Sequence, residues 1–575
     1  MRGTLELWVA RGEPMDVLKS LNARTLGYPL LLVVLCFLLF FWKLGDIPFY
    51  SRGEPREGLV VWEMSSSGNW ILPLVNADYI PFKPPLFHWF GILVAKVLGR
   101  VDEFSVRFPS ALFATLGVFL TYLAGARLWG KKAGIVSAFV LATSPEWWQT
   151  AVIAQVDMTL AFFTVAALLL FFSLYRNGRS TKAESLGLAV LLALATLAKG
   201  PVGILLPSLT IFVFLCIERN LVFLKKLHML PSAALFLLVA GSWYGLATWK
   251  GGQRFLLRQI VDENLLTAAG VEGHYQPFYY YIPVFLVITA PWSLFLPSLC
   301  LYLCAQRHRL REEHLHYPLV WLAVVFLFFS LSLGKRGVYI LPLYPAAALL
   351  LGAWWVKLDQ GEVHPLWLVR LPGYLLAACY LFVAGTFLLR SPGWYPFEIN
   401  NGGILSLFLH AKIAPSLLTS ICLAAFLLAC VLLRRSWNWA FVSLAIMTTA
   451  TAVIVKDLYY PFIAGERTLK PFMERVKRKV EGKSPLLFYQ SFDYGAIFYA
   501  GRHIASYRES GRELQPPFFV LMWEEEWKKM QAQKGLRLLD RSEGKGPAGR
   551  HHMVLAEVTA NTPLPDLERI STEAQ

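Results

Sequence analysis

Long apolar runs alternate with short polar segments over most of this chain. A run of about 18 apolar residues is long enough to cross a bilayer as a helix. Thirteen runs approach or exceed that length, near residues 29–44, 108–126, 135–150, 157–174, 185–198, 201–217, 230–249, 278–303, 318–333, 338–356, 371–389, 414–433 and 437–455. The pattern predicts a polytopic α-helical membrane protein with about 13 transmembrane helices.

The pattern changes after residue 455. Three short apolar runs predict strands, and two stretches with helical spacing lie beside them. The predicted strands cover 485–490, 517–523 and 551–558, and the predicted helices cover 494–501 and 523–535. We therefore divide the chain into an N-terminal segment 1–28, a transmembrane domain 29–455, a small α/β domain 456–560 and a disordered tail 561–575.

The distribution of lysine and arginine predicts how the helices are oriented. With the N-terminus in the cytoplasm, the segments on the inner side hold 20 of these residues, and the short loops on the outer side hold 8. An excess of positive charge marks the cytoplasmic side. Thirteen spans then place the C-terminal domain in the periplasm of a bacterial inner membrane. The loop 45–107 also lies outside, although it carries six basic residues, and a bound anion would explain them.

Composition supports the membrane assignment and removes one alternative. Of the 575 residues, 56% are hydrophobic and 16% are charged, whereas soluble domains average about 25% charged residues. The net charge of +16 would be compatible with nucleic-acid binding. Because the basic residues lie mainly in short loops between apolar runs, the charge reports membrane topology, and we expect membrane lipids as partners and no nucleic acid.

The outer loop 45–107 carries an unusual mixture of charged and aromatic residues between 51 and 89. Glu54, Arg56 and Lys83 lie there, and the loop is expected to be folded. An ordinary solvated loop is the alternative, because charge clusters are usually solvated. An ionisable residue at a membrane face bordered by apolar sequence indicates a functional site.

Further polar residues fall on the same predicted face, at the ends of later spans. Asp157 begins one span, where it could also be a simple boundary residue, and Lys199 occupies a tight turn, where it could also extend its charge to the interface. Lys335 and Arg336 lie in a tight outer turn, although positive charge usually marks the cytoplasmic side. The complete set of candidate binding residues is Arg56, Lys83, Lys199, His274, Lys335, Arg336 and Tyr339.

Two carboxylates facing several cations favour group transfer from a phosphate-activated donor. A carboxylate, Glu54 or Asp157, would take a proton from the acceptor hydroxyl, and lysine or arginine would neutralise the departing phosphate. No nucleotide cofactor is expected, because no phosphate-binding glycine loop occurs. A divalent metal ion bound between the two carboxylates is an alternative that the sequence leaves open.

Several stretches in order resemble a known family of membrane glycosyltransferases. They are GEPREGLVVWEM (53–64), GNWILPLVNADYIPFKPPLFHW (68–89), RFPSAL (107–112), the segment around Asp157, LAKGPVGILLP (197–207), HYQPFYYYIPVFLVITAPW (274–292) and 328–350. The chain resembles the bacterial enzymes related to dolichyl-phosphate-mannose protein mannosyltransferases and to the aminoarabinose transferases of lipid A. Residues 360–575 match only in layout.

This resemblance implies a GT-C-type architecture and a set of roles. It implies that Glu54 serves as base or binds the acceptor, that Lys83 and Tyr339 contact the lipid phosphate, and that Asp157 belongs to the active centre. Relatives commonly carry an acid where this chain has Gly53, so Glu54 with Asp157 takes that role, or Glu57 compensates. The loop 261–278 also departs from the family, so the acceptor is not carried over.

The resulting hypothesis is an inverting glycosyltransferase that moves a pentose or hexose from a polyprenyl-phosphate donor to an envelope acceptor. The acceptor would be lipid A, another glycan or a protein, at the outer face of the inner membrane. A transporter or flippase of a lipid-linked anion is the alternative, although it would favour broken spans near the middle of the membrane. A non-catalytic scaffold would leave Glu54 and Asp157 replaceable.

Overall fold

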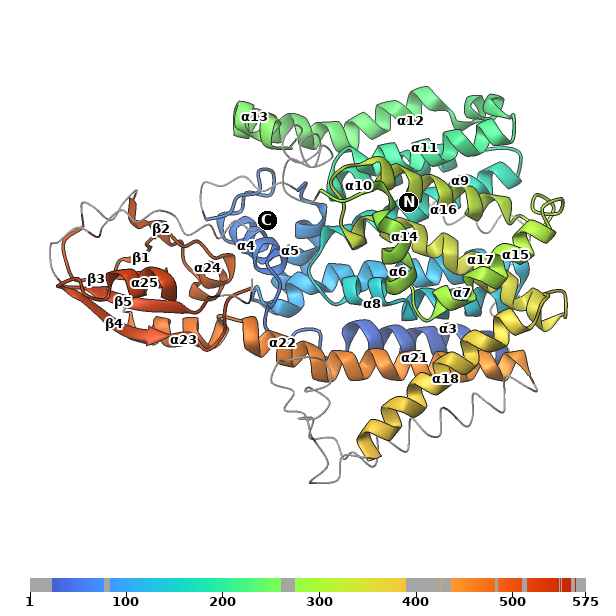
Figure 1. Ribbon diagram of the computed structural model, residues 1–575. Helices are drawn as coiled ribbons and strands as arrows, with labels where there is room; N and C mark the ends of the chain where they lie inside the picture. Colours follow the sequence, from blue (N-terminus) through green and yellow to red (C-terminus); the bar gives the residue numbers. More distant parts are fainter. Residues whose placement is uncertain are drawn as a thin grey trace.

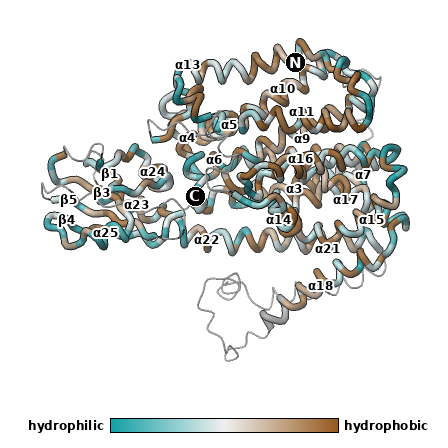
Figure 2. Tube along the Cα trace, turned by 45° about the horizontal axis from the view of Figure 1, so that its top comes forward, coloured by the Kyte–Doolittle hydropathy of each residue, from teal (hydrophilic) through white to brown (hydrophobic). Residues whose placement is uncertain are grey.

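A computed structural model describes residues 23–76, 83–259, 275–388, 426, 436–480, 484–508, 514–547, 549, 551–559 and 564. In this part of the chain a large helical body lies beside a small α/β unit (Figure 1). Apolar residues dominate the helices of the body, whereas the loops at its edge and the α/β unit are more hydrophilic (Figure 2).

Five helices in the described ranges are long and apolar enough to cross a membrane. They are α6 (Glu103–Trp129), α9 (Val156–Arg176), the composite helix Met229–Gln259, the helix Gly337–Asp359 formed by η7 (Gly337–Leu343) and α17 (Tyr344–Asp359), and Trp437–Arg467. A sixth span arises if Phe278–Ile288 and Trp292–Ala305, which meet at 104°, count as one. The protein is therefore a multi-pass helical membrane protein.

Other apolar runs form further helices. They include α3 (Ala23–Cys36), α7 (Lys131–Thr143), α10 (Lys182–Lys199), α11 (Val202–Ile217), α16 (His316–Leu331) and α18 (Trp367–Leu388). Apart from Phe426, the predicted span 414–433 lies outside the described residues. The count of thirteen spans thus stays a prediction.

The predicted span 135–150 is not one helix. Helix α7 ends at Thr143, and a separate helix α8 (Pro145–Ala151) begins after Ser144. Proline interrupts a helix interior but fits the first turn of a helix, so Pro145 starts α8 and does not extend α7. This break produces the short segment that leads from α7 towards α9.

Small residues let the central helices approach closely. A Cβ atom added to Gly134 of α7 would lie 2.5 Å from the carbonyl oxygen of Tyr122 in α6, and one added to Gly352 of α17 would lie 2.7 Å from that of Ala133 in α7. Membrane helices pack through such small residues, because lipid supplies no hydrophobic force that drives them together.

The segment between α3 and α6 is folded. It contains α4 (Gly53–Ser67) and α5 (Leu86–Leu98). Gly68 caps the end of α4 with a φ of 69°, which suits glycine. Buried side chains of this segment share one hydrophobic cluster with the α/β unit, in which Leu59 and Phe87 join Phe472 and Ile497. The first loop and the C-terminal unit therefore pack together, as Figure 1 shows.

The α/β unit is built on a five-stranded sheet with strand order β2-β1-β3-β5-β4. Strands β1 and β3 lie in parallel, while β5 runs antiparallel to β3 and β4. The bounds are β1 (Leu486–Phe488), β2 (Ala505–Ser506), β3 (Phe518–Trp523), β4 (Leu536–Arg541), β5 (Met553–Val558), α23 (Lys470–Lys479), α24 (Tyr494–Ala500) and α25 (Glu524–Met530).

Strands β1, β3 and β5 and helices α24 and α25 coincide with predicted elements, whereas β2, β4 and α23 were not anticipated. The sequence placed the start of the C-terminal domain at residue 456. In the structure the preceding helix continues to Arg467. A π-helical turn, η8 (Val455–Tyr459), buries Lys456, whose ammonium donates to the carbonyl oxygen of Leu39 at 3.0 Å. Because this hydrogen bond allows the lysine to be buried, the helix continues past the residue at which the sequence predicted the start of the next domain.

Candidate active site

Four elements converge at one end of the helical body. They are the start of α4, the start of α9, the end of α10 and the 3-10 helix η7 that opens the span Gly337–Asp359. Most of the predicted site residues lie on these elements or on the loops beside them. His274 lies outside the described residues.

Asp157 and Lys199 form the centre of the site. Asp157 Oδ1 lies 2.5 Å from Lys199 Nζ, and their side chains are 13% and 12% exposed. The aspartate lies in the first turn of α9 and the lysine is the last residue of α10, so each charge is also stabilised by the dipole of its own helix. The ammonium lies 4.1 Å from the centre of the Tyr339 ring. An acid, a base and an aromatic ring thus meet at a partly accessible position.

Glu54 occupies a different environment, because it is fully buried. Its Oε1 accepts from Arg107 Nε at 2.7 Å and from the backbone N–H of Ala154 at 3.3 Å. Among the described residues, its Oε2 has no hydrogen-bond partner. The Ala154 contact lies three residues before Asp157, so Glu54 holds the turn that delivers Asp157 to the site.

Arg107 is a residue that the sequence reasoning missed as part of the site. Its guanidinium is buried and also donates to three backbone carbonyls, those of Leu44, Ile47 and Pro48, at 2.5 to 3.3 Å. The signal was present, because an arginine at the start of an apolar run is as unusual as Asp157. It was overlooked because the resemblance assigned it no role.

A second chain of charges crosses from α4 to α5. Arg56 Nη2 lies 2.8 Å from Glu57 Oε1, and Glu57 Oε2 lies 2.7 Å from Nε2 of the fully buried His88. Burial by itself would raise the pKa of Glu57, but Arg56 and His88 together lower that pKa to about 2. Glu57 is therefore held as a carboxylate between two partners, and it orients Arg56.

Lys83 lies at the meeting point of both charge groups. Burial lowers the pKa of its ammonium well below the usual value, and the nearby charge of Lys199 lowers it further, whereas Asp157 and Glu57 raise it. The two lysines therefore lie close enough to repel each other. A bound dianion would relieve that repulsion, as a phosphate group does beside clustered cations.

Lys335 and Arg336 differ in what they offer to a ligand. Lys335 is buried, and its ammonium donates to the carbonyl oxygens of Gln276, at 2.9 Å, and of Ser332. It therefore holds the turn before η7. Arg336 is exposed, and its backbone carbonyl accepts from Tyr339 N–H at 3.0 Å, so the two residues share one turn.

Glu146 is a second residue that the sequence reasoning missed. It lies in α8, outside the five long spans, with Oε1 4.0 Å from the Cβ position of Gly337. Burial, followed by the charge of Asp157, raises the pKa of Glu146 to about 7, and Arg336 lowers it in part. Only the break between α7 and α8 brings this residue to the site, and the predicted span 135–150 would have hidden it.

The open question of a metal between the two predicted carboxylates can be examined in the described ranges. No group of three or more histidine, cysteine, aspartate or glutamate side chains suited to hold a metal ion occurs there. Glu54 and Asp157 are instead each paired with a cation, Arg107 and Lys199 respectively. The donor set around them therefore does not fit a bridging metal.

Comparison with known proteins places this architecture. The family model described as dolichyl-phosphate-mannose-protein mannosyltransferase matches residues 82–244. An uncharacterised protein of Aquifex aeolicus is 31% identical over 329 residues, which are 57% of this chain and 73% of that protein. The undecaprenyl phosphate-alpha-4-amino-4-deoxy-L-arabinose arabinosyl transferase 1 of Pseudomonas fluorescens is 29% identical over 342 residues. That match covers 57% of this chain, and the chain spans 58% of the length of that relative.

The solved structures extend the likeness to nearly the whole chain. ArnT from Cupriavidus metallidurans in the apo state superimposes with a TM-score of 0.73 at 20% identity, over 95% of this chain and 100% of that one. The same protein bound to undecaprenyl phosphate gives a TM-score of 0.72 over 94% and 99%. The fold is therefore that of the GT-C membrane glycosyltransferases. Within that class, the chain belongs to the PMT-like family, as the resemblance indicated.

Proposed function

We propose that this protein transfers a sugar from a polyprenyl-phosphate donor to a lipid or glycan acceptor of the cell envelope. The observation that carries the proposal is the Asp157–Lys199–Tyr339 cluster, with Lys83 beside it, at one end of the helical body. The names of relatives support a donor of this kind, since one is an undecaprenyl phosphate-aminoarabinose transferase and another is bound to undecaprenyl phosphate. Lipid A is the acceptor that the resemblance to the aminoarabinose transferases of lipid A implies.

The donor phosphate would be held by cations from several elements. Lys83, Lys199 and Arg56 lie near one another, and Arg336 shares its turn with Tyr339. Charge-assisted bonds to phosphate are stronger than neutral hydrogen bonds, and a guanidinium binds two phosphate oxygens at once. Lys335, whose ammonium holds two backbone carbonyls, would support the turn and would not contact the phosphate.

The reaction would be a single displacement at the anomeric carbon. The acceptor hydroxyl oxygen forms the new bond, its proton passes to a carboxylate, and the polyprenyl phosphate leaves with the electrons of the broken bond. Asp157 fits the proton acceptor better than Glu54, because its side chain is partly exposed while Glu54 is fully buried on Arg107. Glu54 would act as a positioning residue through Ala154.

The location follows from the charge distribution. The basic residues of the short loops concentrate on the side opposite the site, which favours a site at the outer face of a bacterial inner membrane. The N-terminus would then be cytoplasmic and the α/β unit periplasmic. A donor linked to a lipid would reach this face within the membrane.

The test measures transfer of a radiolabelled sugar from purified undecaprenyl-phosphate aminoarabinose to lipid A by the full-length protein in detergent. We expect Asp157→Asn to reduce the rate by about 10²–10⁴-fold, the range for loss of a general base. Lys83→Ala is expected to weaken donor binding. The matched control is Lys96→Ala in α5, because that lysine is exposed and lies over the ring of Trp70.

Three outcomes would count against the proposal or its details. If Asp157→Asn keeps full activity and Glu54→Gln loses it, Glu54 is the proton acceptor and Asp157 is not. Equal losses of transfer activity in Lys96→Ala and Lys83→Ala would show that Lys83 does not bind the donor phosphate. No transfer to lipid A, other glycans or envelope protein, with movement of the intact donor lipid across vesicles, would identify a transporter.

A further inference from the structure

The reaction proposed above leaves a proton on Asp157, and each turnover needs a group that takes this proton away. Lys199 Nζ lies 2.5 Å from Asp157 Oδ1. A proton on Asp157 would cancel the charge that attracts this ammonium, so the ion pair favours the return of the carboxylate. The proton must therefore pass to a second acceptor near Asp157.

Two of the other acids at the site are already paired with cations. Glu54 is buried on Arg107, and Glu57 lies between Arg56 and His88. A proton on either carboxylate would leave a buried cation without its counter-charge, which is costly in the interior of a protein. Glu54 and Glu57 are therefore poor recipients for the proton.

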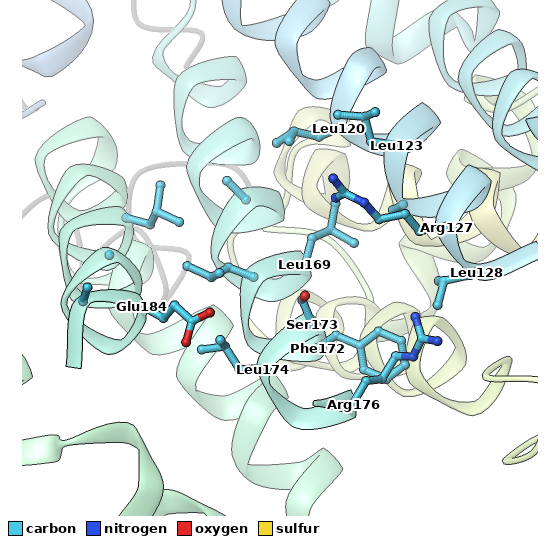
Figure 3. Close-up of a pocket in the computed structure, with 16 residues that line it drawn as sticks. Leu120, Leu123, Arg127, Leu128, Leu169, Phe172, Ser173, Leu174, Arg176 and Glu184 are labelled. Carbon is cyan, nitrogen blue, oxygen red and sulfur yellow. The ribbon is translucent and has the colours of Figure 1, made fainter. Parts of the chain in front are cut away.

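The acid that lines the pocket in Figure 3 is too far away. That pocket lies at the other end of α9, where Ser173 and Glu184 are among the lining residues. Ser173 follows Asp157 by 16 residues on the same helix, which corresponds to about 24 Å along its axis. The carboxylate of Glu184 is also engaged, because it accepts from the backbone N–H and from the hydroxyl of Thr181, both at 2.8 Å.

Glu146 differs from these acids, because it lies near Asp157 and has no partner of its own in the described ranges. Its carboxylate forms no hydrogen bond and no ion pair there, and the charged groups that act on it are Asp157 and Arg336. The hydroxyls of Tyr344 and Tyr460 also lie within reach of its charge. Glu146 is partly exposed, so a proton on its carboxylate can pass to solvent.

The fold fixes the position of Glu146 from two sides. The neighbouring Trp147 is fully buried, and its ring lies against Gly117 of α6, where an added Cβ would come within 2.6 Å of the ring. On the other side, Glu146 Oε1 lies 4.0 Å from the Cβ position of Gly337, the first residue of η7. Tyr339 of the candidate active site lies on the same 3-10 helix. Glu146 is therefore held between α6 and an element of the site.

The surroundings of Glu146 also suit proton exchange near neutral pH. Burial, followed by the charge of Asp157, raises the pKa of Glu146 to about 7, whereas Arg336 lowers it in part. The elements α6, α7 and η1 (Phe37–Phe41) also pack against α8, and within the described ranges they add no charge that acts on Glu146. A group with a pKa near the working pH can both take up and release a proton.

We propose that Glu146 takes the proton of the acceptor hydroxyl over from Asp157 and releases it to solvent. This inference rests on the proposed function. The acceptor O–H bond breaks as its oxygen bonds to the anomeric carbon, and the polyprenyl phosphate leaves with the electron pair of the old bond. The proton moves to the carboxylate of Asp157 and then, directly or through one water molecule, to that of Glu146. This second transfer restores the ion pair between Asp157 and Lys199.

The transfer assay described above tests this route when it is run over roughly two pH units on either side of 7. Because Glu146 must be deprotonated to receive a proton, transfer by the wild type should be fast above pH about 7 and slow below it. Glu146→Gln should lower kcat about 10²-fold, at the lower end of the range for proton-transfer groups, and leave KM for the donor unchanged. It should also remove the slowing near pH 7. Glu146→Asp keeps a carboxyl group and should restore part of kcat together with that slowing.

A matched control comes from the α/β unit. Burial raises the pKa of Glu526 in α25 to about 7 as well. Glu526→Gln therefore removes a carboxyl group with the same titration range from outside the four elements that form the candidate active site, and it should keep the wild-type pH profile. Groups of the donor and of lipid A titrate equally with every variant, so a difference between two profiles belongs to the protein.

Infrared difference spectra of the substrate-free protein give a readout that does not depend on transfer. Spectra recorded about one pH unit below and above 7 should show a protonated carboxyl band that is weaker in Glu146→Gln than in the wild type. If the glutamine variant does not fold, the pH profile and the spectra of Glu146→Asp decide in its place, because both should still differ from those of the wild type.

Separate outcomes overturn the inference and the function on which it rests. The same kcat and pH profile in the wild type and in Glu146→Gln would overturn the inference alone, and so would loss of the slowing near pH 7 in Glu526→Gln. Spectra that do not change with the substitution of Glu146 would also overturn it. No transfer by the wild type at any pH would overturn the proposed function, and the inference with it.

Discussion

At the scale of single residues, the site depends on which cation each acid is paired with. Asp157 is paired with Lys199 at a partly exposed position, Glu54 with Arg107 in full burial, and Glu57 with His88. A buried carboxylate costs a large desolvation energy unless it is paired, so breaking one of the buried pairs would leave an uncompensated charge. The partly exposed pair is the one that can exchange partners with a substrate.

The Glu57 pair makes a prediction about pH. The pKa of Glu57 is about 2 in the folded protein, below its ordinary value of 4.5. A carboxyl group with a lowered pKa stabilises the fold when the pH is above its ordinary pKa. This stabilisation is lost as the pH falls from about 4.5 to 2. The shift corresponds to roughly 3 kcal/mol. Thermal unfolding of the protein in detergent should show that loss, and Glu57→Gln should flatten it; equal slopes in both proteins would contradict it.

At the scale of elements, the helical body is organised by close approaches at glycines. Gly134 of α7 contacts the backbone of α6, and Gly203 of α11 lies against the backbone of α10, where a Cβ would come within 2.2 Å of Ala195. Backbone atoms cannot move aside as a flexible side chain can. The positions of α6 and α10, and so of Arg107 and Lys199, depend on such contacts.

We therefore expect Gly134→Ala to destabilise the protein by about 1–3 kcal/mol, the usual cost of overpacking. The added methyl would lie 2.5 Å from the carbonyl oxygen of Tyr122 and 2.8 Å from the backbone nitrogen of Ala126. Gly245→Ala is the control, because no atom lies within 4 Å of its Cβ position. Melting temperatures in detergent measure both, and an equal effect of the two substitutions would refute the packing argument.

At the scale of the whole molecule, the C-terminal α/β unit is fastened to the first loop next to the site. The hydroxyl of Tyr499 accepts from the backbone N–H of Phe49 at 2.8 Å and donates to Glu103 at 3.0 Å. Asn76 exchanges two hydrogen bonds with the backbone of Ile504. These contacts join the segments on either side of α4, which carries Glu54 and Arg56, to α24 and the residues that follow it, so the unit braces one wall of the site.

Removing the Tyr499 hydroxyl tests that connection. Tyr499→Phe leaves a buried N–H and a carboxylate without one partner each, which typically costs about 1–3 kcal/mol. Hydrogen exchange should accelerate in residues 49–67 and in α24. Tyr507→Phe loses a comparable bond, to the backbone N–H of Leu564 inside the unit, and should leave 49–67 unchanged. Faster hydrogen exchange of residues 49–67 in both variants would show that the effect is not specific to the contact between Tyr499 and the first loop.

Much of this architecture can be predicted from local pattern. Apolar runs predicted most of the long helices of the body, although not α4 and α5 in the first loop, and short apolar runs predicted β1, β3 and β5. The failures have local causes. Pro145 splits an apolar run that hydropathy joins, and β4, with the sequence LRLLDR, is exposed over much of its length and shows no alternation. Burial of Lys456 extends a helix that its charge would end.

By itself, the sequence determined that this is a helical membrane protein with its unusual charges gathered at one face, because hydropathy and charge act locally along the chain. Only the tertiary structure decided which of these side chains pair with one another. Arg107 binds Glu54 across 53 residues, Lys199 binds Asp157 across 42, and Glu146 reaches Gly337 through the break at α8. Pairing depends on how the helices pack, and packing is a property of the assembled body. Which acid is buried and which is partly exposed follows from that packing.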